Sequence, residues 1–209
     1  TNVSRHASTT RAESIRKLTA ACGLSASASN AVLLILDVEE HQLAACNAIG
    51  RALPDFSMKS RRKSGGTVKI ACALKAGKFL KADAKTKDVV ERSREAARFV
   101  DMPPTDLDPQ SFATAAKKLL RAVTGVKVTE IVGNDLLKKK LGGIHAVGRC
   151  AKSAPRVLIA KANSGKKGKH IALVGKGITY DTGGLHIKGR GAMETMKADM
   201  GGAAAVLGA

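Results

Sequence analysis

Short apolar runs of strand length alternate along this chain with segments whose apolar residues recur at helical spacing. Strands that alternate with helices are typical of α/β folds with a mostly parallel sheet. The expected strands are residues 31–37, 67–74, 126–132, 156–161 and 170–175. The expected helices are residues 11–22, 39–53, 84–100, 109–123, 134–140 and one that starts at Met200, and residues 142–148 are expected to form a small-residue turn.

A charged helical segment at residues 84–101 divides the chain, and the two prolines after Met102 stop it. Residues 1–83 are predicted to form a small, incomplete N-terminal α/β domain, joined by this linker helix to the next domain. Residues 102–209 are predicted to be the first part of a larger α/β domain with a mostly parallel sheet. Because the sequence begins without Met and ends within an Ala/Gly-rich run, we expect a fragment cut at both ends.

The net charge of the 209 residues is +19, from 36 Lys and Arg against 17 Asp and Glu. Such a charge can attract nucleic acid or an acidic membrane surface. Aromatic residues are only 2% of the chain, so there are few platforms on which bases could stack. The basic residues are dispersed, with short clusters at 59–63, 138–140 and 166–169. A solvated surface is the favoured interpretation, nucleic acid is an unsupported alternative partner, and no stretch has the apolar length of a membrane span.

The four cysteines are far apart in the sequence, with no C-x-x-C spacing: Cys22, Cys46, Cys72 and Cys150. This spacing argues against a zinc knuckle and against a disulfide scaffold. We interpret the cysteines as mostly buried small hydrophobic residues of a protein in a reducing compartment.

Residues 175–188 read GKGITYDTGGLHIK and follow directly on the apolar run at 170–174. Lysine is costly to bury and glycine weakens regular elements, so packing alone does not explain this composition. In open α/β sheets ligands gather beyond the carboxyl ends of strands, which is where Lys176 and Asp181 are expected. The segment matches neither a phosphate loop nor a dinucleotide fingerprint, and the chain has no H-E-x-x-H. The sequence therefore predicts a functional site that does not bind a nucleotide.

Two carboxylates, Asp181 and Asp199, offer hard oxygen ligands around this segment. A lysine can join such a metal site only as a neutral amine, which a metal enforces by competing with the proton. Taken singly, each residue has a simpler interpretation: Asp199 could cap the helix that starts at Met200, and Lys188 could lie on a solvated turn. His186 and His145 are interpreted as structural, since nothing in the sequence supplies either with a triad partner.

The order K-x4-D-x6-K-x10-D, at Lys176, Asp181, Lys188 and Asp199, resembles the metal-binding core of the leucyl aminopeptidase (cytosol aminopeptidase) family. The resemblance is closest to the "probable aminopeptidase-like" branch of that family. It is carried by residues 174–209, is weaker at 102–109 and 142–150, and thins in residues 1–80.

The resemblance implies roles for these four residues in two-metal hydrolysis of peptides. Lys176 is implied to be a neutral amine ligand, Asp181 to bridge two divalent ions, Zn or Mn, and Asp199 to complete the site that Lys176 serves. Lys188 is implied to stay an ammonium that polarises the scissile carbonyl and stabilises the oxyanion. The implied activity is release of N-terminal residues such as leucine from peptides with a free N-terminus.

The family's further Asp, bridging Glu and Arg come from an N-T-D-A-E-G-R-like run that is not in this sequence. We therefore expect the chain alone to be inactive and its parent protein to be active. The resemblance also implies a cytoplasmic homo-oligomer, a hexamer. The alternative is an inactive relative that acts as a basic nucleic-acid-binding or structural subunit.

Overall fold

The computed structural model describes residues 8–24, 29–58, 67–162, 168, 170–185 and 187–209. The chain forms two compact units, residues 1–98 with Gly208 and residues 99–207 with Ala209. The division falls within one long helix, α3 (Ala84–Asp101). The domain boundaries that we place at 83/84 and 101/102 stay predictions.

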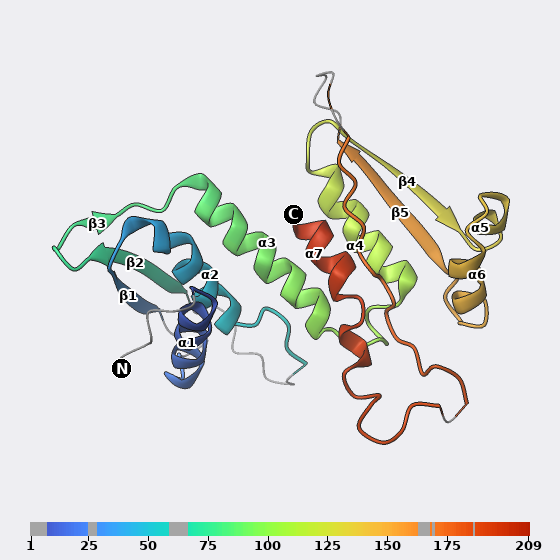
Figure 1. Ribbon diagram of the computed structural model, residues 1–209, viewed down its shortest axis with the longest axis horizontal. Coiled ribbons are helices and arrows are strands. Elements are labelled where there is room, and N and C mark those ends of the chain that lie inside the picture. Colours follow the sequence, from blue (N-terminus) through green and yellow to red (C-terminus); the bar gives the residue numbers. More distant parts are fainter. Residues whose placement is uncertain (1–7, 25–28, 59–66, 163–167, 169, 186) are drawn as a thin grey trace. The chain divides into compact units, whose positions relative to one another are not determined.

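The first unit is built around a three-stranded mixed sheet with the order β1-β2-β3 (Figure 1). Its elements are α1 (Ser8–Ala21), β1 (Asn30–Leu36), η1 (Glu39–His41), α2 (Gln42–Ala52), β2 (Val68–Leu74), β3 (Phe79–Leu80) and the first part of α3. Strands β1 and β2 are parallel, with Asn30 opposite Val68 and Leu36 opposite Leu74. The crossover through η1 and α2 makes this parallel pairing sterically feasible.

The core of the first unit lies where α2 packs on the sheet. Its buried members are Leu36, Ala45, Cys46, Cys72 and Leu80, with Ile15, Leu34, Ile70, Leu74 and Val90 packed against them. The expectation of mostly buried cysteines holds for Cys46 and Cys72 but is wrong for Cys22 and Cys150, which are exposed. Cys22 directly follows the end of α1, and Cys150 lies two positions after α6, a helix without buried residues.

The second unit has a two-stranded sheet, and its pairing differs from the expected one. Its elements are the end of α3, α4 (Pro109–Arg121), β4 (Val126–Val132), α5 (Asp135–Lys138), α6 (Gly142–Gly148), β5 (Arg156–Ala162), η2 (Met196–Ala198) and α7 (Gly201–Gly208). Strands β4 and β5 pair antiparallel, from Val126 opposite Ala162 to Val132 opposite Arg156. The α/β class is confirmed, but the mostly parallel sheet is wrong for these two strands. The connection between them returns to the end of β4, where Gly133 N donates to Pro155 O at 2.9 Å, instead of crossing over.

Two further local predictions are wrong. Residues 142–148 form helix α6 rather than a turn, because main-chain hydrogen bonds such as Arg149 N to His145 O (2.9 Å) outweigh the low helix propensity of glycine. Residues 170–175 form no strand, and Ile171 and Val174 are 86% and 91% exposed. A strand needs a neighbour to pair with its backbone, and among the described residues no strand is paired with this segment.

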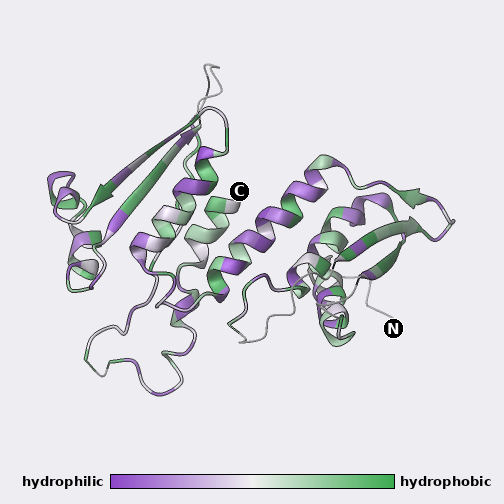
Figure 2. Ribbon diagram, turned by 180° about the vertical axis from the view of Figure 1, so that it is seen from behind, coloured by the Kyte–Doolittle hydropathy of each residue, from purple (hydrophilic) through white to green (hydrophobic). Residues whose placement is uncertain are grey.

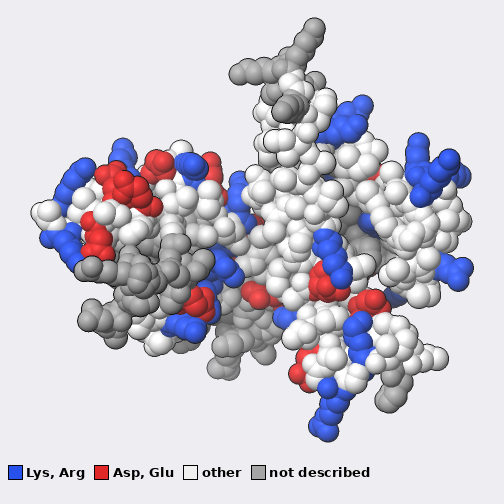
Figure 3. Space-filling view, in the orientation of Figure 1, with Lys and Arg blue, Asp and Glu red and all other residues white. Residues whose placement is uncertain are grey.

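Apolar and polar residues are distributed differently over the strands and over helix α3. The strands of both units are mostly apolar, whereas α3 is banded with polar residues (Figure 2). Lys and Arg are scattered over the face drawn in Figure 3 and are interspersed with Asp and Glu. Among the helices of the described residues, none is long and apolar enough to cross a membrane.

Helix α4 begins as the sequence indicates. The Asp108 carboxylate accepts a hydrogen bond of 2.7 Å from Ser111 N, and Pro109 occupies the first turn. This bond holds the pKa of Asp108 below its ordinary value. The rings of Phe99 and Phe112 contact each other in a tilted arrangement, with centroids 5.1 Å apart and an interplanar angle of 51°, and both residues are almost fully buried.

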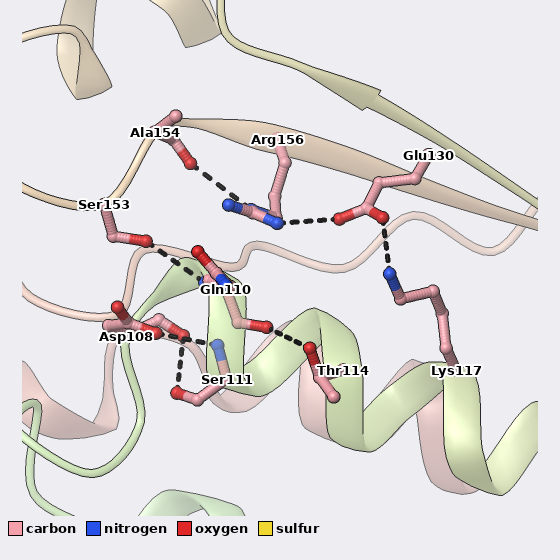
Figure 4. A network of polar contacts seen from close by, with 9 residues as sticks. All are labelled: Asp108, Gln110, Ser111, Thr114, Lys117, Glu130, Ser153, Ala154 and Arg156. Carbon is pink, nitrogen blue, oxygen red and sulfur yellow. Dashed lines mark hydrogen bonds and ion pairs between the residues drawn. The ribbon is translucent and has the colours of Figure 1, made fainter.

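Glu130 on β4 joins α4 to the sheet (Figure 4). Its carboxylate accepts from Lys117 Nζ of α4 at 2.6 Å and from Arg156 of β5 at 2.8 Å. The side chains of Glu130 and Arg156 are only 18% and 12% exposed, so water screens this pair weakly. The hydrogen bond from Lys117 is the main cause that holds the pKa of Glu130 below 4.5, with Arg156 adding to it.

Replacing Glu130 with Gln is expected to lower the free energy of unfolding by about 1 to 3 kcal/mol, because two cations lose their shared charged acceptor. A lowered folded-state pKa stabilises the fold at pH above 4.5, and this contribution is lost as the pH falls through the folded-state pKa. The variant should therefore also lose stability less steeply in acid. Urea unfolding from pH 3 to pH 7 measures both effects.

The matched control for Glu130→Gln is Asp135→Asn, which removes an exposed ion pair with Lys138 (62% and 77% exposed). Exposed pairs contribute little, so the control should unfold like the original chain. Equal stability of the two variants would contradict the role given to Glu130.

Candidate functional site

The main chain around Lys176 lies against the first turn of α7. Ala203 N donates to Lys176 O at 2.8 Å. The approach is close enough to need glycine on both sides: a methyl group added at Gly175 would lie 2.5 Å from Ala203 Cα, and one at Gly202 would lie 2.9 Å from Lys176 N. Because these two positions carry no side chain, the main chain at Lys176 can lie next to the start of α7.

Replacing Gly175 with Ala is expected to lower the free energy of unfolding by about 1 to 3 kcal/mol, because the added carbon meets backbone that must shift. The control is Gly189→Ala in the same loop, where an added carbon meets nothing within 4 Å. Urea unfolding followed by circular dichroism measures the difference. If both variants unfold at the same urea concentration, residue 175 does not lie against α7.

Asp199 and Lys176 meet directly. The Asp199 carboxylate lies at the end of η2, and its Oδ1 is 3.2 Å from Lys176 Nζ. A hydrogen bond of 2.9 Å from Lys197 Nζ to Asp101 O anchors η2 to the end of α3. The fully buried Met200 takes the N-cap position of α7 without a side-chain cap hydrogen bond. The Asp199 carboxylate therefore faces Lys176, and the simpler interpretation of Asp199 as a helix cap is not what the structure shows.

Asp181 and Lys188 form a second pair within one turn. Lys188 Nζ donates to the main-chain oxygen of Asp181 at 2.8 Å, and Gly183 N donates to Asp181 Oδ1 at 2.7 Å. Gly183 and Gly184 have φ of 77° and 126°, a region that side chains other than hydrogen disfavour. Lys188 is half-buried in this turn, so it does not extend freely into solvent.

The structure thus places the four predicted residues in two pairs, Lys176 with Asp199 and Asp181 with Lys188. Among the residues that the structure describes, no three His, Cys, Asp or Glu side chains gather closely enough to hold a metal ion. A site here would therefore need the lysine amine as a ligand and further donors. The ligand roles of Lys176, Asp181 and Asp199 and the catalytic role of Lys188 stay predictions.

A shallow hollow of about 330 Å³ lies beside Lys188, and sequence reasoning did not predict it. It is lined by Thr182, Gly184, Leu185, Ile187, Lys188 and Met193. Leu185 and Ile187 are 100% and 69% exposed. The sequence signal that could have indicated it is the apolar residue on either side of position 186, in an otherwise polar loop.

His145 and His186 are the two histidines that the sequence analysis interprets as structural. His145 Nε2 lies 3.1 Å from Asn134 Oδ1 at the surface, which agrees with a structural contact. His186 lies outside the described residues.

Two parts of the chain match known domains. Residues 94–209 match the cytosol aminopeptidase family, catalytic domain, and residues 1–62 match M17 aminopeptidase N-terminal domain 2. Leucine aminopeptidase 1 of Caenorhabditis elegans is 40% identical over 163 residues, which are 77% of this chain and 32% of the relative. The human "Probable aminopeptidase NPEPL1" is 35% identical over 214 residues, which cover 99% of this chain and 40% of the relative.

Solved structures agree with these matches. The leucine aminopeptidase of C. elegans superposes with a TM-score of 0.84 at 34% identity, over 99% of this chain and 42% of that protein. The bottromycin maturation enzyme BotP in complex with Mn superposes with a TM-score of 0.69 at 25% identity, over 97% of this chain and 43% of that protein. The sequence spans less than half the length of each of these proteins. The chain belongs to the cytosol aminopeptidase family.

Proposed function

We propose that the protein containing this chain is a metal-dependent aminopeptidase that releases N-terminal residues such as leucine from peptides. The observation that carries the proposal is the contact of 3.2 Å between Lys176 Nζ and Asp199 Oδ1, two residues far apart in the motif. In a chain of this family, the convergence of an amine and a carboxylate beside glycine-lined backbone supports a metal site, and the 62% exposed Lys176 side chain is open to an incoming ion.

The donor set is chemically suited to divalent ions. Carboxylate oxygens of Asp181 and Asp199 and the amine of Lys176 are oxygen and nitrogen ligands of the kinds that Zn and Mn accept. In the absence of metal the same amine and carboxylate can pair as ions, so metal binding would displace a proton from the amine. Two ions bound there would supply a water of lowered pKa and polarise the peptide carbonyl. The Mn complex of BotP supports manganese as one candidate, with zinc as the other.

Lys188 is proposed to stabilise charge on the substrate. An ammonium has three donors, and Lys188 uses one of them on the main-chain oxygen of Asp181. The remaining donors can point at the oxygen of the scissile carbonyl, where negative charge develops. The anchoring bond keeps the ammonium in place and lowers the entropy that it loses in the transition state.

The hollow beside Lys188 suits an apolar substrate side chain. Leu185, Ile187 and Met193 line it, and burying apolar substrate surface against them is favourable. This arrangement supports leucine-like residues as the preferred N-terminal residues.

The proposal extends to the parts of the protein outside this sequence. The resemblance places a further Asp, a bridging Glu and an Arg downstream, so this chain alone is proposed to be inactive. The whole protein is proposed to be a cytoplasmic homo-oligomer, a hexamer. The rival function, an inactive subunit that binds nucleic acid, gains no support from Figure 3, in which basic and acidic side chains are intermingled on the face drawn.

The test is an assay of the whole protein on leucine amide and on a leucine-initiated peptide, with Mn or Zn and with a chelator. The expected result is metal-dependent release of free leucine by the whole protein and none by the 209-residue chain. Absence of leucine release with either metal, together with salt-dependent retention of DNA or RNA that Asp181→Ala does not change, would favour the rival function.

A further inference from the structure

Two buried thiols lie next to each other in the core of the first unit. Cys46 on α2 and Cys72 on β2 have Sγ atoms 3.6 Å apart and are 5% and 2% exposed. They are 26 positions apart in the sequence, so the tertiary fold brings them together. The proposed peptidase chemistry uses neither of them.

The surroundings of the pair are apolar. Leu36, Ala45 and Leu80 complete the buried cluster around the two sulfur atoms, and each thiol is the other's hydrogen-bond partner. Burial, and then the neighbouring Cys72, raises the pKa of Cys46 to about 12. A free thiolate is therefore disfavoured at this position, whereas a neutral disulfide adds no charge to the core.

We infer that Cys46 and Cys72 form an oxidative modification site, which hydrogen peroxide converts from two thiols to one disulfide. One sulfur attacks a peroxide oxygen, the O–O bond breaks, and a sulfenic acid and one water result. The second sulfur then attacks the sulfenic sulfur and a second water leaves. In sum, two thiols and one peroxide give one disulfide and two waters, and both thiol protons end in water.

The geometry requires only a small movement. The two sulfur atoms must approach from 3.6 Å to about 2.05 Å, which rotation about the side-chain bonds and a slight shift of α2 on the sheet can supply. No other residue has to resolve the sulfenic acid, because the partner thiol is already in contact. The raised pKa of Cys46 makes the oxidation slow at neutral pH and faster as the pH rises.

The disulfide would tie α2 to β2 across the crossover of the first unit. A cross-link between these positions restricts the unfolded chain and stabilises the folded one. The expected consequence is a rise in Tm of about 5 to 10 °C that dithiothreitol reverses.

The test is to treat the folded whole protein with hydrogen peroxide, block free thiols, and map the unreduced peptides by mass spectrometry. The expected result is a cross-linked peptide that contains Cys46 and Cys72 and is lighter by two hydrogen atoms than the two reduced peptides together. This measurement needs no substitution, so it does not depend on the folding of a variant. The exposed Cys22 and Cys150 report that the peroxide has reacted with the protein.

Two variants separate this site from the exposed thiols. The double variant Cys22→Ser/Cys150→Ser should keep the cross-link and the rise in Tm, and Cys72→Ala should lose both. The inference is wrong if Cys46 and Cys72 are recovered as free thiols after Cys22 and Cys150 have been oxidised. It is equally wrong if the reversible rise in Tm persists in Cys72→Ala. Neither outcome depends on aminopeptidase activity, so failure here is distinct from failure of the proposed function.

Discussion

Replacing Lys188 with Met in the whole protein should lower kcat by about 100-fold to 1,000-fold and change KM little. The reason is that the ammonium is proposed to interact more strongly with the oxyanion of the transition state than with the neutral carbonyl of the substrate. Its position is defined by the hydrogen bond to Asp181 O, and methionine has similar length but no donor. Steady-state kinetics on leucine amide, with saturating metal, give kcat and KM separately.

Lys127→Met is the matched control for Lys188→Met, because Lys127 is an exposed lysine on β4 and its loss changes the net charge equally. The control should keep the original kcat. Lys188→Arg retains a cation but has a planar head, so partial activity is expected from it. A fall in kcat of the same size in Lys127→Met would show that overall charge, not the ammonium in the loop, affects the reaction.

Replacing Lys176 with Met should weaken the binding of one metal ion by at least about 100-fold and abolish activity at low metal concentration. The amine is proposed as a direct ligand, and its contact with Asp199 fixes where it lies. Metal content measured by mass spectrometry after gel filtration should fall from two ions per chain toward one.

Asp199→Asn provides an independent check on the Lys176 prediction, because it changes the partner in the same contact. It should weaken the same ion, whereas Lys127→Met should leave the metal content unchanged. If Lys176→Met keeps both ions with the original affinity, the amine is not a ligand, and the contact with Asp199 is an ordinary ion pair.

Much of the fold follows from local sequence patterns. The apolar runs at 31–37 and 126–132 match β1 (Asn30–Leu36) and β4 (Val126–Val132) to within one residue. The cap at Asp108 and the following proline mark the start of α4 correctly. These features depend on residues close together in the sequence, so local rules are sufficient.

Two of the errors concern long-range pairing of strands, and one concerns a helix. The apolar run at 170–175 has the composition of a strand, but a strand also needs a neighbour, and composition carries no information about one. The antiparallel direction of β5 likewise depends on the connection from β4. This connection contains two short helices and returns to the end of β4, where Gly133 N donates to Pro155 O. Helix α6 contains three glycines and forms nevertheless, because its context outweighs propensity.

The sequence names a set of candidate site residues but does not predict how they are arranged. The order of Lys176, Asp181, Lys188 and Asp199 along the sequence carries the resemblance, whereas their division into two contacting pairs appears only in three dimensions. The proximity of Cys46 and Cys72 was unpredictable for the same reason, since 26 positions separate them and no motif connects them.

The most direct test of the proposed metal site is a crystal structure of the whole protein with zinc, using anomalous scattering at the zinc absorption edge. We expect two peaks, with Lys176 Nζ and an Asp199 oxygen about 2.0 to 2.2 Å from one ion and the Asp181 carboxylate in contact with both. Peaks elsewhere, or a Lys176 amine that still pairs with Asp199 and touches no ion, would contradict it.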